Sequence, residues 1–264
     1  MPSRLGQNFL INRVIARRIV ALLDFRPGEA VIEIGSGQGA LTRLILERLP
    51  RVNSKIIAIE KDAALADQLR EELSDQGSNI EIIEGDVLKK IGGIVNKLAG
   101  QPYRIIGNIP YYITGQILRV LSELTAKPKQ IVLMVQKEVA QRIISKPPAM
   151  NLLAAITQLW SSPKIALYVS KGNFRPAPKV DSAVIILNPK DKADLNEVSN
   201  LIGFFKIIFK QPRKTLFNNL RSGLKESPEK IENSLRALGY NEKTRANEFS
   251  VSDLEKLHQE LTKG

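Results

Sequence analysis

Five short apolar runs, bounded by turn-forming or polar residues, recur along the first half of the chain. They cover Ala30–Ile34, Lys55–Glu60, Ile80–Glu84, Tyr103–Asn108 and Ile131–Val135. Most of these runs are rich in Ile, and all have the length of a strand. Each is therefore predicted to form a strand of a buried sheet.

Helical patterns lie between these strands, with apolar residues three or four positions apart in segments 41–49, 64–73 and 117–121. Strands that alternate with helices predict βαβ units and a parallel sheet, which binds ligands at the carboxyl ends of its strands. Two later β-rich runs, Ile165–Val169 and Ala183–Leu187, have no long helix between them. They predict an antiparallel pair at the edge of the sheet, as is typical of methyltransferase sheets.

The pattern changes near residue 190 to charged, helical sequence. Helices are predicted over Phe204–Leu220, Pro228–Leu238 and Val251–Leu261. We therefore predict two domains: a Rossmann-like α/β domain over residues 1–190 and a small α-helical domain over residues 191–264.

The amino-acid composition excludes several kinds of active site and metal site. The 264 residues include no Cys and one His. The lack of Cys excludes disulfides and thiolate metal sites, and a single His excludes His-based triads and His clusters, so we expect no metal. The apolar stretches are far shorter than the roughly 20 residues of a membrane-spanning helix, and the first residues lack an apolar signal core. A soluble, cytoplasmic protein is expected.

The net charge of +12 is concentrated in the middle of the chain. Residues 101–190 carry 12 Lys and Arg against 3 Asp and Glu, whereas residues 1–100 carry 14 against 13 and residues 191–264 carry 13 against 11. A basic face predicts a polyanionic partner, since each neutralised phosphate releases counterions. A merely solubilising surface is the alternative.

A glycine-rich turn with Gly35, Gly37 and Gly39 follows the first predicted strand of the sheet and precedes a helix. Glycines there permit a tight turn and a close approach of the backbone to a ligand. Glu60 ends the next strand, as an acid that binds a ribose does. The turn and Glu60 fit both NAD and S-adenosylmethionine, because both cofactors contain a ribose.

Asp86 and Val87 follow the third strand, where we expect them to line the cofactor site. Asp86 can accept a hydrogen bond from an adenine amino group, or it can cap the following helix. A nicotinamide enzyme needs a proton donor near the hydride, and the single His258 lies in the terminal helix. Methyl transfer needs no such group, because S-adenosylmethionine brings its own leaving group and the protein supplies alignment and electrostatics.

The segment Asn108-Ile109-Pro110-Tyr111 ends the fourth strand and suits a planar amino group. The Asn108 side-chain oxygen and the Ile109 carbonyl can accept both N–H bonds of an exocyclic amino group. Pro110 fixes the turn, and Tyr111 can stack on an unstacked base. A Pro-stopped strand with a core Tyr is the alternative interpretation, which the preceding cofactor turn disfavours.

The chain resembles the KsgA family of ribosomal RNA adenine dimethyltransferases, which are related to the Erm methylases. The resemblance covers nearly the whole chain and is carried by these segments: Leu5-Gly6-Gln7-Asn8-Phe9-Leu10, Glu33-Ile34-Gly35-Ser36-Gly37-Gln38-Gly39-Ala40-Leu41-Thr42, Gly107-Asn108-Ile109-Pro110-Tyr111, Gln136-Lys137-Glu138-Val139-Ala140, Phe174-Arg175-Pro176-Ala177-Pro178-Lys179-Val180-Asp181-Ser182-Ala183-Val184 and Gln211-Pro212-Arg213-Lys214-Thr215-Leu216.

The resemblance implies a substrate, a cofactor site and one further aromatic residue. The implied substrate is a pair of adjacent adenosines in a loop near the 3′ end of small-subunit ribosomal RNA, presented within the assembling subunit, each of which receives two methyl groups. The residues implied to line the S-adenosylmethionine site are Asn8, Leu10, Gly35, Glu60, Asp86 and Asn108. Phe174 is implied to pack against the target base from the side opposite Tyr111. We expect the protein to act as a monomer.

Basic residues in the C-terminal segment are the candidates for RNA contacts. Between Asn200 and Arg221 there is no acidic residue, and the basic residues are Lys206, Lys210, Arg213, Lys214 and Arg221. Helical spacing is expected to put several of them on one face, opposite a buried apolar stripe. An ordinary solvated face is the alternative.

Three other functions stay open on the sequence. An Erm-type enzyme would act on the large ribosomal subunit, although the segments around Phe174 and Arg213 favour the small subunit. A noncatalytic RNA-binding assembly or transcription factor is disfavoured by the intact cofactor turn. A nicotinamide oxidoreductase would be recognised by the cofactor that raises its melting temperature.

Overall fold

The computed structural model describes three stretches of the chain. These are residues 7–50, 53–190 and 195–263. Leu5 and Gly6, which open the first segment of the resemblance, lie outside them. The chain forms two compact units, the first made of residues 1–140 and 162–189 and the second of residues 141–161 and 190–264.

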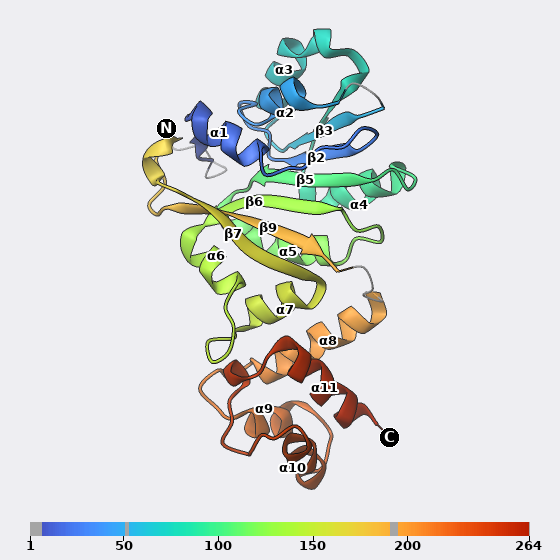
Figure 1. Ribbon diagram of the computed structural model, residues 1–264, viewed down its shortest axis with the longest axis vertical. Coiled ribbons are helices and arrows are strands. Elements are labelled where there is room, and N and C mark those ends of the chain that lie inside the picture. The colour runs from blue at the N-terminus through green and yellow to red at the C-terminus, as the bar shows by residue number, and fades with distance from the viewer. Residues whose placement is uncertain (1–6, 51–52, 191–194, 264) are drawn as a thin grey trace. The chain divides into compact units, whose positions relative to one another are not determined.

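A seven-stranded sheet forms the centre of the first unit (Figure 1). In spatial order its strands are β4 (Ile80–Glu84), β3 (Lys55–Glu60), β2 (Ala30–Ile34), β5 (Tyr103–Asn108), β6 (Gln130–Gln136), β9 (Ser182–Pro189) and β7 (Ser161–Val169). The first five are parallel, whereas β9 runs antiparallel to β6. The predicted α/β fold class is therefore confirmed, with all seven predicted strands in place and β7 beside β9 at the edge.

Helices pack on the sheet and connect its strands (Figure 1). They are α1 (Arg13–Val20), α2 (Thr42–Arg48), α3 (Ala63–Glu72), α4 (Val87–Lys97), α5 (Thr114–Ser122) and α6 (Lys137–Ile143), with short 3₁₀ turns η1 (Ser74–Asn79), η2 (Tyr111–Ile113) and η3 (Lys171–Asn173). Buried residues of α1 and α2 share a core with alternate residues of the sheet such as Val31, Ala58 and Val132. This alternation is the two-residue period of a strand with both faces covered.

A separate two-stranded ladder holds the N-terminal segment beside a much later part of the chain. Strand β1 (Phe9–Leu10) pairs antiparallel with β8 (Phe174–Arg175). Beyond the ladder, the Asn12 side chain caps α1 and donates to the Asn173 side chain at 2.7 Å. The residues just before α1 are thereby fixed next to residues 173–175.

Glycine at position 107 is required by the close approach of β5 to β2. A Cβ atom at Gly107 would lie only 2.6 Å from the Ile34 carbonyl oxygen. The two strands are paired in parallel with Ile34 opposite Gly107. The glycine turn after β2 and Asn108 at the end of β5 are therefore neighbours at the carboxyl edge of the sheet.

The second unit is a helical bundle with its own core. Its helices are α7 (Leu152–Trp160), α8 (Leu195–Ile208), α9 (Leu216–Gly223), α10 (Pro228–Ala237) and α11 (Val251–Thr262), with a 3₁₀ turn η4 (Ala246–Glu248). Phe205 and Phe249 are fully buried at the centre. This unit differs from the predicted domain 191–264, because it also includes residues 141–161: Ala154 and Leu159 of α7 are buried in the same core.

The predicted single helix over Phe204–Leu220 is wrong. Helix α8 ends at Ile208 and α9 begins only at Leu216. Pro212 lies between them, and a proline in a helix interior removes one hydrogen bond and clashes with the preceding turn. The basic residues of this segment are consequently split between two helices and a loop.

Within the described ranges, no helix is long and apolar enough to cross a membrane.

Candidate active site

A pocket opens at the carboxyl edge of the sheet in the first unit, with an empty volume of about 1050 Å³ that includes its open mouth. It brings together nearly all the residues predicted from the sequence to bind the cofactor or the target. These are Asn8, Leu10, Gly35, Gly37, Glu60, Asp86, Val87, Asn108, Ile109, Pro110 and Tyr111. The expected grouping of strand ends into one site is therefore observed, while the role of each residue stays a prediction.

Glu60 closes the glycine turn from the neighbouring strand. It is almost fully buried, and its Oε2 accepts the Gly37 N–H at 2.7 Å while its Oε1 accepts the Asp62 N–H at 2.9 Å. A carboxylate has about four lone-pair sites. Glu60 can therefore hold the turn and still accept a hydrogen bond from a hydroxyl group of a ligand in the pocket.

Asp86 both lines the pocket and caps α4, so its two alternative roles are compatible. Its Oδ1 accepts the Leu88 N–H at 3.0 Å, and its Oδ2 lies 2.9 Å from the Lys61 ammonium. The hydrogen bond from Lys61 lowers the pKa of the Asp86 carboxyl. Asp86 is therefore ionised at neutral pH and suited to accept a hydrogen bond from an amino group.

Glu33 is a buried acid in the pocket wall. It is only 1% exposed, and its Oε2 has no hydrogen-bond partner among the described residues. Burial raises the pKa of the Glu33 carboxyl to about 7, and the nearby Glu60 carboxylate acts in the same direction. Ser36, in the adjacent turn, also has a buried hydroxyl without a partner in the described structure. Such orphaned polar atoms suit a polar ligand.

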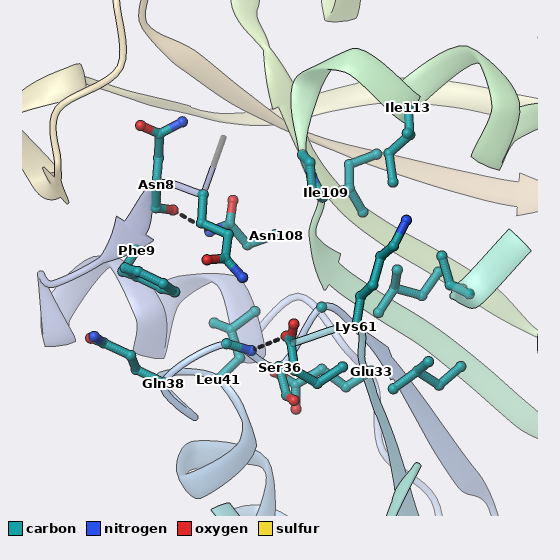
Figure 2. Close-up of a pocket in the computed structure, with 18 of the residues that line it drawn as sticks. Asn8, Phe9, Glu33, Ser36, Gln38, Leu41, Lys61, Asn108, Ile109 and Ile113 are labelled. Atoms are coloured by element: carbon teal, nitrogen blue, oxygen red, sulfur yellow. Dashed lines mark hydrogen bonds between the residues drawn. The ribbon is translucent and has the colours of Figure 1, made fainter. Parts of the chain in front are cut away.

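Asn108 is held in one orientation by the N-terminal segment. Its Nδ2 donates to the Asn8 carbonyl at 3.0 Å, as the dashed line in Figure 2 shows. The same amide keeps Oδ1 as an acceptor. The predicted acceptor side chain is thus oriented by a contact that joins residues 100 positions apart.

Tyr111 follows the same strand end and begins η2. Its hydroxyl lies 2.7 Å from the Ser182 hydroxyl at the start of β9. Burial raises the pKa of the Tyr111 phenol, so the ring is neutral near pH 7. Ile109, two residues earlier, is buried, whereas Tyr112, which also lines the pocket, is 62% exposed.

Phe174 is not among the residues that line the pocket. Its ring is buried in the core shared with α1 and α2, and its backbone pairs with Leu10 in the β1–β8 ladder. This is the arrangement of an anchored core aromatic. A role for Phe174 against the target base stays a prediction, and it would require the ring to leave this position.

Sequence reasoning did not assign roles to Glu33, Ser36 and Lys61, all of which line the pocket. Glu33 gave a signal that could have been used, because it is the single charged residue in the apolar strand β2. A charged side chain in a strand buried on both faces needs a functional or structural reason. Lys61 gave no such signal, since an exposed Lys after a strand is common.

The five candidate RNA-binding residues lie in the second unit. Lys206 is on α8 and Arg221 on α9, whereas Lys210, Arg213 and Lys214 lie in the loop between these helices. The expectation that helical spacing gathers several of them on one face is therefore wrong for the three loop residues.

The buried side chain of Asn219 shapes this loop. Its Oδ1 accepts the Gln211 N–H at 3.2 Å, and its Nδ2 donates to the Gln211 carbonyl at 3.1 Å. An amide that binds both polar groups of one residue fixes the loop backbone. The three basic side chains are therefore displayed from a shaped loop.

The residues that the structure describes contain no group of three or more His, Cys, Asp or Glu side chains able to hold a metal ion. The pocket instead contains three acids, at or near the ends of β2, β3 and β4, together with Lys61, a hydroxyl from Ser36 and amides that include Asn108 of β5. This set suits an organic ligand that carries hydroxyl and amino groups.

Sequence comparison gives a match along almost the full chain. Residues 2–263 match the family described as ribosomal RNA adenine dimethylase. Two proteins named ribosomal RNA small subunit methyltransferase A are similar to the chain. The protein of Koribacter versatilis is 38% identical, with 99% of this chain and 95% of its own covered, and that of Dehalococcoides mccartyi strain CBDB1 is 37% identical, with 96% and 86% covered.

Two solved structures are similar over nearly their full length. A dimethyladenosine transferase from Plasmodium falciparum has a TM-score of 0.80 at 25% identity, covering 97% of this chain and 98% of its own. The 23S rRNA methyltransferase ErmE has a TM-score of 0.73 at 25% identity, covering 96% and 99%.

Proposed function

The chain belongs to the ribosomal RNA adenine dimethylase family, and from this premise we propose that it dimethylates N6 of two adjacent adenosines in small-subunit ribosomal RNA. The target is a loop near the 3′ end of that RNA within the assembling small subunit, and the enzyme acts in the cytoplasm as a monomer. The observation that carries the proposal is the pocket in which the Asn108–Tyr111 segment lies beside the glycine turn.

The pocket fits S-adenosylmethionine, the cofactor of this class of enzyme. In this proposal Glu60 holds the ribose hydroxyls, and Asp86 holds the adenine amino group. The unpartnered polar atoms of Glu33 and Ser36 lie where further polar groups of a ligand can satisfy them. When bound, S-adenosylmethionine would supply a methyl group carried on a sulfonium, and loss of this methyl group leaves a neutral thioether.

The residues at the end of β5 prepare the target nitrogen. The lone pair of an exocyclic adenine nitrogen is delocalised into the ring, so the nitrogen must become pyramidal to attack. Asn108 Oδ1 and the Ile109 carbonyl accept its N–H bonds and stabilise the positive charge that develops there. Tyr111 stacks on the base and excludes water from this face.

Mapping of methyl groups tests this function. The protein is incubated with methyl-labelled S-adenosylmethionine and either small-subunit or large-subunit particles that lack the modification, and the labelled nucleotides are mapped. Two adjacent N6,N6-dimethyladenosines in small-subunit RNA are expected. Label in large-subunit RNA would favour the Erm-type alternative, and cofactor binding without label would favour a noncatalytic RNA-binding factor.

Glu60→Ala should weaken S-adenosylmethionine binding by about 1.5–3 kcal/mol, because it removes a charge-assisted contact to the ribose. The loss of the Gly37 contact also loosens the turn. Calorimetry on both proteins measures the difference. Glu81→Ala, which removes an exposed acid from β4 outside the pocket, is the control and should bind as wild type does. Equal affinity of wild type and Glu60→Ala would refute the assignment.

Replacing Lys210, Arg213 and Lys214 together with Gln should weaken RNA binding without changing cofactor affinity. Loss of up to three phosphate contacts should reduce the slope of log affinity against log salt by about 2–3. Binding to small-subunit RNA is measured over a range of salt concentrations.

The matched control for the loop variant replaces three other basic residues of the same unit, Lys225, Lys230 and Arg236, with Gln. Lys230 and Arg236 already pair with acids of the same unit. An equal change in salt slope in both variants would show that net charge alone is responsible. The loop would then be an ordinary solvated surface and not an RNA-binding site.

A further inference from the structure

Tyr168 presents an aromatic ring to solvent near the end of β7. It is 55% exposed, whereas its neighbours Leu167 and Val169 pack into the core. The Lys137 ammonium lies 5.5 Å from the centre of the Tyr168 ring. A cation at this distance is attracted to an aromatic face. The two side chains therefore form a surface that is both aromatic and positively charged.

A short series of contacts joins this surface to the base pocket. The Tyr111 hydroxyl lies 2.7 Å from that of Ser182, which is the first residue of β9. The carbonyl of the preceding residue, Asp181, accepts the Lys137 N–H at 3.0 Å. Ser182 is also paired with Gln136 across the β6–β9 ladder. Strand β7, which carries Tyr168, lies beside β9 in the sheet (Figure 1), and β9 begins at the Ser182 that contacts Tyr111.

Positive charge surrounds the same edge. The segment that connects β7 to β9 exposes three basic side chains: Lys171, Arg175 and Lys179. Two acids lie here as well, Glu138 beside Lys137 and the half-buried Asp181, whose carboxylate already accepts the Lys171 N–H at 3.0 Å. The balance remains positive, which favours a phosphate-bearing partner over an acidic or neutral one.

We propose that Tyr168 and Lys137 form a platform that binds an unpaired nucleotide next to the target adenosine. The base of that nucleotide stacks on Tyr168, and Lys137 pairs with its phosphate. This inference rests on the proposed function, since it assumes an RNA substrate in the pocket. It adds a second base-binding position on the β7–β9 edge.

The chemistry of a splayed RNA loop fits this surface. When one base leaves the stack to enter the pocket, its neighbour loses a stacking partner. Proteins replace such partners with exposed aromatic rings, whose contact with a base is tolerant of sequence. Because Tyr168 is carried by a strand rather than a mobile loop, its ring is offered at a fixed position.

Binding of two short RNA probes tests the platform. One is an oligoadenylate, and the other is a chain of the same length with abasic sugars, so the two differ only in their bases. Wild type should prefer oligoadenylate, and Tyr168→Ala should reduce its affinity for oligoadenylate about 5- to 150-fold. Its affinity for the abasic chain should change little, and Tyr168→Phe should bind both probes as wild type does.

Lys137→Gln should lower the affinity for both probes equally, because Lys137 acts on their phosphates. Lys164→Gln is the matched control, since Lys164 lies on the same exposed face of β7 about 13 Å away and should leave both affinities unchanged. The platform is refuted if wild type shows no preference for bases, if Tyr168→Ala keeps that preference undiminished, or if Tyr168→Phe loses it as well.

Steady-state methylation of small-subunit particles gives a second readout. Tyr168→Ala should raise KM by a similar factor and leave kcat within about threefold, because stacking of a neighbour acts mainly on binding. A drop in kcat alone would also refute the platform. Methyl mapping with the wild-type protein is independent of these variants, so failure of the platform and failure of the proposed function are distinguishable.

Discussion

Asn108→Ala should slow methyl transfer by roughly a hundredfold or more while leaving RNA binding nearly intact. The lost acceptor matters most as the adenine nitrogen becomes pyramidal and gains positive charge, and loss of one oriented group in a dry site costs about 2.7–4 kcal/mol at the barrier. Single-turnover methylation with saturating RNA and cofactor measures this effect. Tyr111→Ala should also impair capture of the target base.

A second effect of Asn108→Ala must be separated from the first. The substitution also removes the hydrogen bond from Asn108 Nδ2 to the Asn8 carbonyl, which anchors the N-terminal segment. Asn12→Ala is the matched control, because it removes the side-chain hydrogen bond from the same segment to Asn173, together with the cap of α1, without touching the pocket. If Asn12→Ala is as slow as Asn108→Ala, the anchor is responsible. A folded Asn108→Ala protein with nearly the wild-type rate would rule out this site as the acceptor pocket.

Glu29→Ala should lower the free energy of unfolding by about 3–5 kcal/mol, because it leaves the buried Arg104 guanidinium without its counterion. Arg104 on β5 binds Glu29 through Nε at 2.6 Å and Nη2 at 3.3 Å, and the two side chains are only 8% and 9% exposed. Urea unfolding followed by circular dichroism measures the change.

Two comparisons make this stability test specific. Glu47→Ala breaks an exposed ion pair, in which the Arg13 side chain is 65% exposed and the Glu47 side chain 51%. This substitution should lower the free energy of unfolding by no more than about 1 kcal/mol. Replacing Glu29 and Arg104 together with Met should cost less than Glu29→Ala, because no unpaired charge remains buried. A similar loss for Glu29→Ala and Glu47→Ala would show that burial does not strengthen the first pair.

The central strands of the sheet could be predicted from the sequence because both of their faces are covered. A strand buried on two sides reads as a continuous apolar run, and β2, β3 and β5 match the predicted ranges to the residue. The partly exposed edge strand β4 also matches, through its three Ile residues. The positions of Glu60, Asp86 and Asn108 followed from the same pattern. In a parallel sheet with βα order, residues that end successive strands meet at one edge.

The helical unit was predicted less well because its boundaries depend on packing. Apolar residues at helical spacing lie on both sides of residues 210–215, but this stretch is polar apart from Pro212. The chain leaves the helix there, and Pro212 together with the Asn219 contacts to Gln211 fixes a loop. Residues 141–161 join this unit through the burial of α7 against α8. Periodicity marks which face of a helix is apolar but not which core covers it.

Local sequence thus determined the order of strands and helices, the glycine turn and the polar side chains at the strand ends, since each depends on neighbours within a few residues. Tertiary structure alone decided the orientation of the Asn108 amide by Asn8, the burial of Phe174 against Leu10, and the contact of the Tyr111 hydroxyl with Ser182. Each of these contacts joins residues more than 50 positions apart. Their geometry is set by strand pairing and packing, which no periodicity or motif records.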